Sequence, residues 1–267
     1  MKYEIKKGKK MKIGFIGFGN VSSTLASILK KEGHEIYTSS TNRSKKTKEL
    51  INKIGAISLK DFNEVSKISE VVISANSPSK AIPIAKKYGK LSKNIFIDLN
   101  NISPDSTLEI SNELGDKFLK GAIIGKINLN ENFIFISGKN AEKISILRNS
   151  KLKIKILSES VSDASIIKTL RSIYTKGVSA LLIETFKIAK EMNLEEELFE
   201  TLELTEGELF KVKSLSRINN SILYSKRKYD ELKDILEYLN KFNDLNEEKT
   251  DLILLKATLK AFKSIQD

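Results

Sequence analysis

The sequence of 267 residues contains no cysteine, no tryptophan and a single histidine. Without cysteine, the chain has no disulfide framework, no thiolate zinc site, no iron–sulfur cluster and no cysteine nucleophile. With His34 as the only imidazole, a Ser-His-Asp triad, a two-histidine metal site and a His-Asp dehydrogenase pair are disfavoured. Acid–base chemistry therefore falls to lysine, tyrosine, aspartate or glutamate, and no metal site is expected.

Acidic residues are also in deficit, because 46 lysines and arginines face 34 aspartates and glutamates, for a formal net charge of +12. Such a charge is compatible with nucleic acid or an anionic membrane surface as a partner. The lysines are scattered among acidic residues, however, and only five of the basic residues are arginine, which favours a solvated surface. No segment reaches the ~18 apolar residues of a membrane span. We therefore expect a cytoplasmic protein without nucleic-acid or membrane partners.

Turn-forming residues are concentrated in the first half of the chain. All three prolines and eleven of the thirteen glycines precede residue 139. Residues 1–10 are predicted to be a flexible basic extension, and residues 11–160 alternate short apolar runs with amphipathic stretches. This order predicts a Rossmann doubly wound, mainly parallel sheet with helices on both faces. The strands are expected at 12–16, 35–38, 71–74, 95–98, 119–123 and 133–136, and the helices at 21–31, 46–54, 79–87 and 105–114.

Residues 161–267 contain no convincing strand and are predicted to form an all-helical C-terminal domain. The helices are expected at 163–192, 195–212, 218–239 and 247–265. On the first of these, one face carries Ser165, Lys168, Ser172 and Thr175. The apolar side chains are expected to mark its buried side, and they are Ile166, Ile167, Leu170, Tyr174, Val178 and Leu181.

The strongest local signal is a glycine-rich turn between the first strand and the first helix. Gly17 permits a tight turn, and Gly19 lets a pyrophosphate approach the N–H groups at the helix start. A purely structural turn is the alternative. The predicted cofactor contacts from this turn are Gly17, Phe18, Gly19, Asn20 and Val21. Because ligands lie at the carboxyl ends of the strands in such sheets, the residues after strand 71–74 are assigned to the same site; they are Ala75, Asn76 and Ser77.

The end of the second strand favours NADP over NAD. An acidic residue holds the ribose 2′-hydroxyl in typical NAD sites, but this position holds hydroxyl and amide residues followed by Arg43. A guanidinium pairs with a 2′-phosphate, which an acid would repel. The alternative is a capped helix start with one exposed arginine. His34 lies in the turn before this strand, at the end away from the cofactor, so we expect a structural role for it.

Two further segments carry candidate substrate or catalytic side chains. Asn100 and Asn101 follow strand 95–98 and offer both donors and acceptors, although a turn explains them equally well. Lys168, on the polar face of the long helix, can polarise a carbonyl or exchange a proton with a hydroxyl; periodicity alone favours a solvated face. Tyr-x-x-x-Lys sequences at 224–228 and 229–233 match the acid–base pair of short-chain dehydrogenases, but their place in a late, charged helix indicates chance.

Taken together, the segments 11–19, 33–34, 42–44, 98–104 and 162–177 resemble the β-hydroxyacid dehydrogenase / 6-phosphogluconate dehydrogenase superfamily. The chain is most similar to its 3-hydroxyacid dehydrogenase-like branch with a C-terminal domain of unknown function. The resemblance implies hydride transfer between a nicotinamide and a hydroxy-bearing carbon, and a homodimer formed through the helical domain. It also implies that Lys168 is the catalytic lysine and that Asn42, Arg43 and Ser44 meet the 2′-phosphate of NADP.

The substrate half departs from the family pattern. Ser172 replaces a common asparagine, Ile124 replaces a serine before Gly125, and Asn100 and Asn101 replace Ser-Thr. A standard hydroxyisobutyrate or 6-phosphogluconate substrate is therefore not expected. The positions matching the family's substrate site are Asn100, Asn101, Gly125 and Ser172, and Lys120 and Lys126, with Lys168, suit an anionic substrate. We predict an NADP(H)-dependent oxidoreductase acting on a small molecule; the alternatives are an NADP-binding sensor without hydride chemistry and a Rossmann-type methyltransferase.

Overall fold

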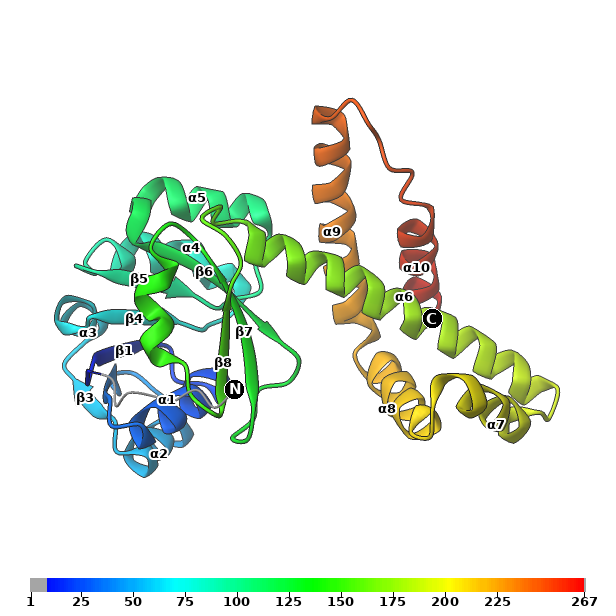
Figure 1. The fold of residues 1–267 in the computed structure, drawn as a ribbon, viewed down its shortest axis with the longest axis horizontal. Helices are drawn as coiled ribbons and strands as arrows, with labels where there is room; N and C mark the ends of the chain where they lie inside the picture. Colours follow the sequence, from blue (N-terminus) through cyan, green and yellow to red (C-terminus); the bar gives the residue numbers. More distant parts are fainter. Residues whose placement is uncertain (1–8, 267) are drawn as a thin grey trace, which may run out of the picture. The chain divides into compact units, whose positions relative to one another are not determined.

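The computed structural model describes residues 9–266, so most of the predicted basic extension lies outside the described residues. The chain divides into two compact units, Met1–Lys168 and Thr169–Asp267 (Figure 1). Among the described helices, none is both long and apolar enough to cross a membrane.

The first unit is built on one eight-stranded sheet with the strand order β3-β2-β1-β4-β5-β6-β7-β8. The neighbouring strands are parallel except for β6 and β7. The chain reverses its direction of winding between β1 and β4, where open sheets of this kind bind ligands. The predicted doubly wound, mainly parallel sheet is therefore confirmed. The bounds are β1 Lys12–Ile16, β2 Glu35–Ser39, β3 Ile57–Leu59, β4 Val71–Ser74, β5 Ile95–Asp98, β6 Phe118–Ile124, β7 Asn132–Ser137 and β8 Leu152–Ile156.

Helices cover both faces of this sheet and close two apolar cores. Leu25 of α1 belongs to one core, and Val65 of α3 and Ile110 of α5 belong to the other. The central strands β4 and β5 are buried along their whole length, as their unbroken apolar runs require. The helices are α1 Asn20–Lys31, α2 Lys45–Ile54, α3 Phe62–Ile68, α4 Ala81–Ile84 and α5 Pro104–Leu114, with short turns η1 Pro78–Lys80, η2 Ala85–Gly89, η3 Gly115–Lys117 and η4 Ala141–Leu147.

The second unit is helical, and α6 enters it from the first. Its apolar core is small, consisting of Ala180, Leu232, Leu255 and Phe262. The predicted single helix over 195–212 is wrong, because Gly207 has a φ of +94° that ends one helix before the next begins. The predicted helices at 218–239 and 247–265 also begin too early. The bounds are α6 Asp163–Glu191, α7 Glu195–Glu206, α8 Phe210–Leu223, α9 Ser225–Leu245 and α10 Ile253–Ser264.

The burial of α6 is the reverse of the prediction. Tyr174 and Leu181, expected on the buried side, are 68% and 65% exposed in the single chain. On other faces Ser165 and Lys176 are buried, at 2% and 6% exposure. The hydroxyl of Ser165 is hydrogen-bonded to that of Thr107, and the ammonium of Lys176 contacts the hydroxyl of Ser172 and the carboxylate of Glu231. The apolar stripe of α6 is therefore left for another surface to cover.

Candidate active site

The glycine turn at the carboxyl end of β1 has the shape that a diphosphate needs. Gly17 adopts a φ of +88°, and a Cβ atom there would lie 2.3 Å from Oδ1 of Asn76. A side chain is therefore excluded at this position. At Gly19 a Cβ atom would meet nothing within 4 Å, which leaves open space in front of the backbone.

The first turn of α1 presents donors to that space. Its N-cap residue is Gly19, which has no side chain to accept from the turn, and the turn contains no acidic residue. The exposed N–H groups and the helix dipole both favour an anion. The backbone of residues 17–21 therefore fits the diphosphate of a dinucleotide. Phe18 can contribute only its backbone, because its ring is buried edge-on against Phe15 at 6.0 Å between centroids.

A second cationic position lies after β2. The guanidinium of Arg43 lies over the ring of Phe62, 4.9 Å from its centroid. This cation–π contact holds the side chain in place, and because the ring carries no charge, the guanidinium keeps its positive charge. Asn42 turns the chain with a φ of +56°. Ser44 then caps α2 by accepting a hydrogen bond from the N–H of Thr47 at 3.3 Å, which uses the serine hydroxyl within the protein.

Two lysines that sequence reasoning overlooked follow this cap. Lys45 and Lys46 open α2, whose first turn has no acidic residue. Both are exposed, and they stand at the positive end of the helix dipole. The sequence did contain a signal for them, because both lysines directly follow Ser44, a residue type that often caps a helix. With Arg43, they make the edge of β2 suited to a 2′-phosphate.

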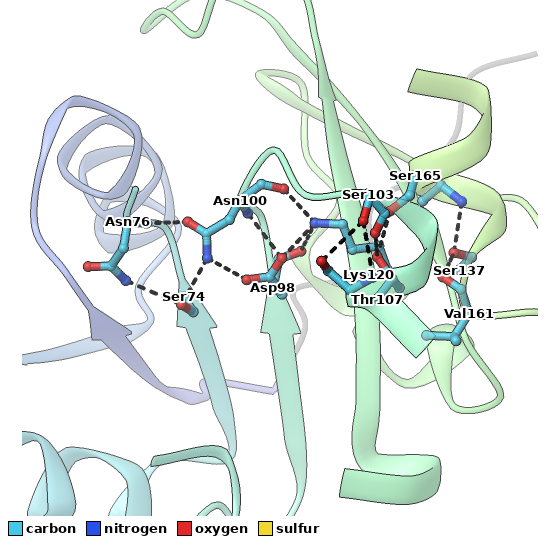
Figure 2. A network of polar contacts seen from close by, with 12 residues as sticks. Ser74, Asn76, Asp98, Asn100, Ser103, Thr107, Lys120, Ser137, Val161 and Ser165 are labelled. Atoms are coloured by element: carbon cyan, nitrogen blue, oxygen red, sulfur yellow. Dashed lines mark hydrogen bonds and ion pairs between the residues drawn. The ribbon is translucent and has the colours of Figure 1, made fainter. Parts of the chain in front are cut away.

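Asn76 ties the glycine turn to the neighbouring strands (Figure 2). Its side-chain amide donates to the carbonyl of Ile16 at 2.7 Å and to Oγ of Ser74 at 3.2 Å. Its backbone N–H donates to Oδ1 of Asn100. Because these bonds join the ends of β1, β4 and β5, they hold the ligand-binding edge of the sheet in one conformation.

The same network continues into a buried ion pair. Asp98 and Lys120 are register partners on β5 and β6, and they are 0% and 1% exposed. The ammonium of Lys120 donates to Oδ2 of Asp98 at 2.6 Å, to the carbonyl of Asn100 at 2.6 Å and to the carbonyl of Asp98 at 3.2 Å. The side-chain amide of Asn100 donates to the other carboxylate oxygen. Burial lowers the pKa of Lys120, and the carboxylate of Asp98 opposes that shift.

These contacts correct two expectations. Lys120 was expected to suit an anionic substrate, but it is enclosed by the sheet and each N–H of its ammonium has an acceptor. A buried carboxylate needs such a counter-ion. Asn100 was expected to offer its amide to a ligand, but it is 3% exposed and its amide is bonded to Asp98, Ser74 and the N–H of Asn76.

The start of α6 is fixed to the first unit by buried hydroxyl groups. Ser137, at the end of β7, accepts from the N–H of Ala164 at 3.0 Å and donates to the carbonyl of Val161 at 2.7 Å. The hydroxyls of Thr107 on α5 and Ser165 lie 2.8 Å apart, as Figure 2 shows. Lys168 lies three residues after Ser165 and on the same face of α6. It is half-buried, and its helix turn is held against the helix that follows β5.

The remaining residues that were predicted to bind cofactor or substrate lie in both units. Ser77, Asn101 and Gly125 are exposed and follow β4, β5 and β6, so they share the carboxyl edge of the sheet. Ala75, at the end of β4, is half-buried. Ser172 lies in the helical unit, where it accepts a hydrogen bond from Lys176.

His34 has the structural role predicted for it. It is 6% exposed, and its Nδ1 accepts a hydrogen bond from the N–H of Met11 at 3.2 Å. Burial lowers its pKa, against the opposing charges of Glu32 and Glu70. The neutral imidazole is therefore favoured, and it anchors the start of β1 at the edge opposite the glycine turn.

Comparisons with known proteins agree with this geometry. Residues 12–102 match a family described as NADP oxidoreductase, coenzyme F420-dependent. An uncharacterized 28.5 kDa protein of Methanothermus fervidus is 40% identical over 258 residues, which are 96% of this chain and 100% of that protein. The structure of the conserved protein MTH1747 of unknown function, described as similar to 3-hydroxyacid dehydrogenases, is 36% identical, with a TM-score of 0.78 over 96% of each chain.

More distant structures share the fold. A 3-hydroxyisobutyrate dehydrogenase of Mycobacterium tuberculosis, solved with L-serine, is 13% identical, with a TM-score of 0.77 over 96% of this chain and 94% of that one. The chain therefore has the fold that MTH1747 shares with 3-hydroxyacid dehydrogenases, and its glycine turn lies within the residues that match the NADP oxidoreductase family. The chain belongs to the family of the Methanothermus fervidus protein and MTH1747, and its N-terminal part is the NADP-binding domain of that class.

Proposed function

We propose that this protein transfers hydride between NADP(H) and a small, anionic hydroxy- or oxo-acid, with Lys168 as the acid–base group. The observation that carries the proposal is the fixed start of α6. Ser165 is bonded to Thr107 of α5, and α5 follows the loop that carries the exposed Asn101. This anchoring supports a position for Lys168 beside the carboxyl edge of the sheet, where Ser77 and Gly125 also lie.

In the proposed reaction, the ammonium of Lys168 donates a hydrogen bond to the substrate oxygen. That bond stabilises the negative charge that develops on the oxygen, and the same group gives or takes the proton. When bound, NADPH supplies the hydride. Asn101, the backbone at Gly125 and the exposed Lys126 are proposed to bind the substrate. Asn100 and Ser172 are proposed to hold their neighbours, Asn76 and Lys176, in place.

A substrate screen tests the reaction directly. The purified protein is mixed with NADPH and small oxo-acids, or with NADP⁺ and hydroxy-acids, and the absorbance of the reduced nicotinamide is followed. Substrate-dependent turnover is the expected result. Tight NADPH binding without turnover of any acid would instead support a cofactor-binding sensor. Binding of S-adenosylmethionine in place of NADPH would support a methyltransferase.

Cofactor selection depends on Arg43 in this proposal. Arg43→Ala is expected to weaken NADPH binding by about 1.5–3 kcal/mol, the value of a hydrogen bond to a charged group. NADH has no 2′-phosphate, so its affinity is expected to stay the same. Fluorescence titration with both nucleotides measures the difference, and Arg148→Ala is the control for loss of an arginine elsewhere. Equal losses for NADPH and NADH would contradict the assignment.

We also propose a homodimer formed through the helical unit. Tyr174, Leu181 and Ile188 follow one another at seven-residue spacing on α6, and they are 68%, 65% and 47% exposed. Side chains at this spacing form one stripe along a helix. The core of the unit is small, and exposed apolar stripes of this kind mark association surfaces. A second copy of the chain is the proposed cover.

A charge in the middle of this stripe is expected to separate the subunits. In Leu181→Glu, each subunit loses about 1.5–3 kcal/mol of apolar burial, and a dimer loses it on both sides. The dissociation constant is therefore expected to rise at least roughly 100-fold. Sedimentation velocity over a concentration series measures this change. Lys190→Glu, on the opposite side of α6, should leave the association unchanged; a monomeric wild-type protein at all concentrations would overturn the proposal.

A further inference from the structure

Three helices of the second unit bring cationic side chains together around one carboxylate. Lys176 of α6 is 6% exposed. It donates to the hydroxyl of Ser172, and its Nζ lies 2.8 Å from Oε2 of Glu231 on α9. A buried ammonium is stable only with such partners.

A second lysine lies on the helix that carries this carboxylate. Lys228 lies three residues before Glu231, so the two side chains share a face of α9. Its ammonium is half-buried and donates to Oγ of Ser221 at 2.7 Å, and that serine, on α8, is 0% exposed. Glu231 contacts Lys176, and the charges of both Lys176 and Glu231 act on Lys228.

The positive charge of this cluster exceeds the negative charge. Arg227 also approaches Glu231, at 3.7 Å, and within residues 9–266 no carboxylate forms an ion pair with Lys228. Burial and the charges of Lys176, Arg227 and Arg217 lower the pKa of Lys228 to about 8, against the opposing effect of Glu231. Like charges held together in a partly buried site oppose folding unless an anion accompanies them.

We propose that this cluster is an anion site that binds a phosphate group, with Lys176 and Lys228 as its two charged donors. A phosphate dianion accepts several charge-assisted hydrogen bonds at once and matches two ammonium groups in charge. The hydroxyls of Ser172 and Ser221 orient the two lysines. The site lies wholly within the helical unit, so it does not depend on the proposed hydride transfer.

Titration calorimetry of the full chain with inorganic phosphate, and separately with glycerol phosphate, tests the site. NADP⁺ is kept at saturation so that the cofactor site is closed to phosphate. Lys228→Met and Lys176→Met are each expected to weaken binding roughly 10- to 100-fold, as loss of a charge-assisted hydrogen bond does. Lys226→Met is the matched control, because it removes an exposed charge from the same helix. Lys228→Arg should retain binding.

The pH dependence gives an independent readout. Phosphate affinity should fall as the pH rises through about 8, because Lys228 loses its proton there; the charged groups that act on it are Lys176, Arg227, Glu231 and Arg217. Lys228→Arg should remove that fall. Absence of binding to wild-type protein, or an equal loss in Lys226→Met and Lys228→Met, would overturn the proposal. Loss of binding in Arg43→Ala but not in Lys228→Met would place the phosphate at the cofactor edge instead and would also overturn it.

Discussion

Replacing Lys168 by alanine is expected to lower kcat about 10²- to 10⁴-fold, the usual contribution of a positioned acid–base group. The affinity for NADPH should not change, because the cofactor is proposed to contact the glycine turn and the edge of β2. KM should change less than kcat, because stabilisation of the developing charge acts in the transition state. Steady-state kinetics with a substrate from the screen, together with NADPH titration, measures all three quantities.

Two variants separate chemistry from folding in this experiment. Lys168→Arg keeps the charge but not a group that exchanges a proton near neutral pH, so it should restore substrate binding better than kcat. Lys187→Ala removes an exposed lysine from the same helix and should keep full activity. If Lys168→Ala turns over substrate at the wild-type rate, another group supplies the proton and the proposed role is wrong.

The buried pair of Asp98 and Lys120 should give the largest effect on stability. Lys120→Met is expected to lower the free energy of unfolding by about 3–5 kcal/mol, because the carboxylate of Asp98 would remain buried without a counter-ion. Asp98→Asn should be destabilising for the converse reason. Urea unfolding followed by circular dichroism measures both. Lys153→Met, on the exposed side of β8, is the control and should change stability by less than about 0.5 kcal/mol.

The double variant tests whether the two effects belong to one interaction. With Lys120→Met and Asp98→Asn combined, neither charge of the buried pair remains. The double variant should therefore be less destabilised than the sum of the single variants. Additive losses would show that the ammonium and the carboxylate are not coupled, which contradicts the arrangement of the network.

The central strands and the glycine turn were predictable because their signals are local. Unbroken apolar runs specify the buried strands β4 and β5, and a glycine that must adopt a positive φ specifies the turn at Gly17. β3 was missed because it has only three residues and little burial. β8 was missed although Lys153 and Lys155 alternate with apolar residues, the period of an edge strand.

The sequence by itself determined the class of fold, and it predicts the diphosphate turn and the preference for NADP at Arg43, because each depends on residues close together in the chain. Only the tertiary structure decided which lysine side chains are exposed and which are buried. Lys120 is buried because its strand lies beside the one that carries Asp98, and Lys228 is half-buried where its side chain reaches Ser221 of the neighbouring helix α8. The apolar stripe of α6 is exposed in the single chain, because no other described helix of its unit packs over Tyr174, Leu181 and Ile188. Burial depends on contacts between distant segments, which periodicity along one segment does not specify.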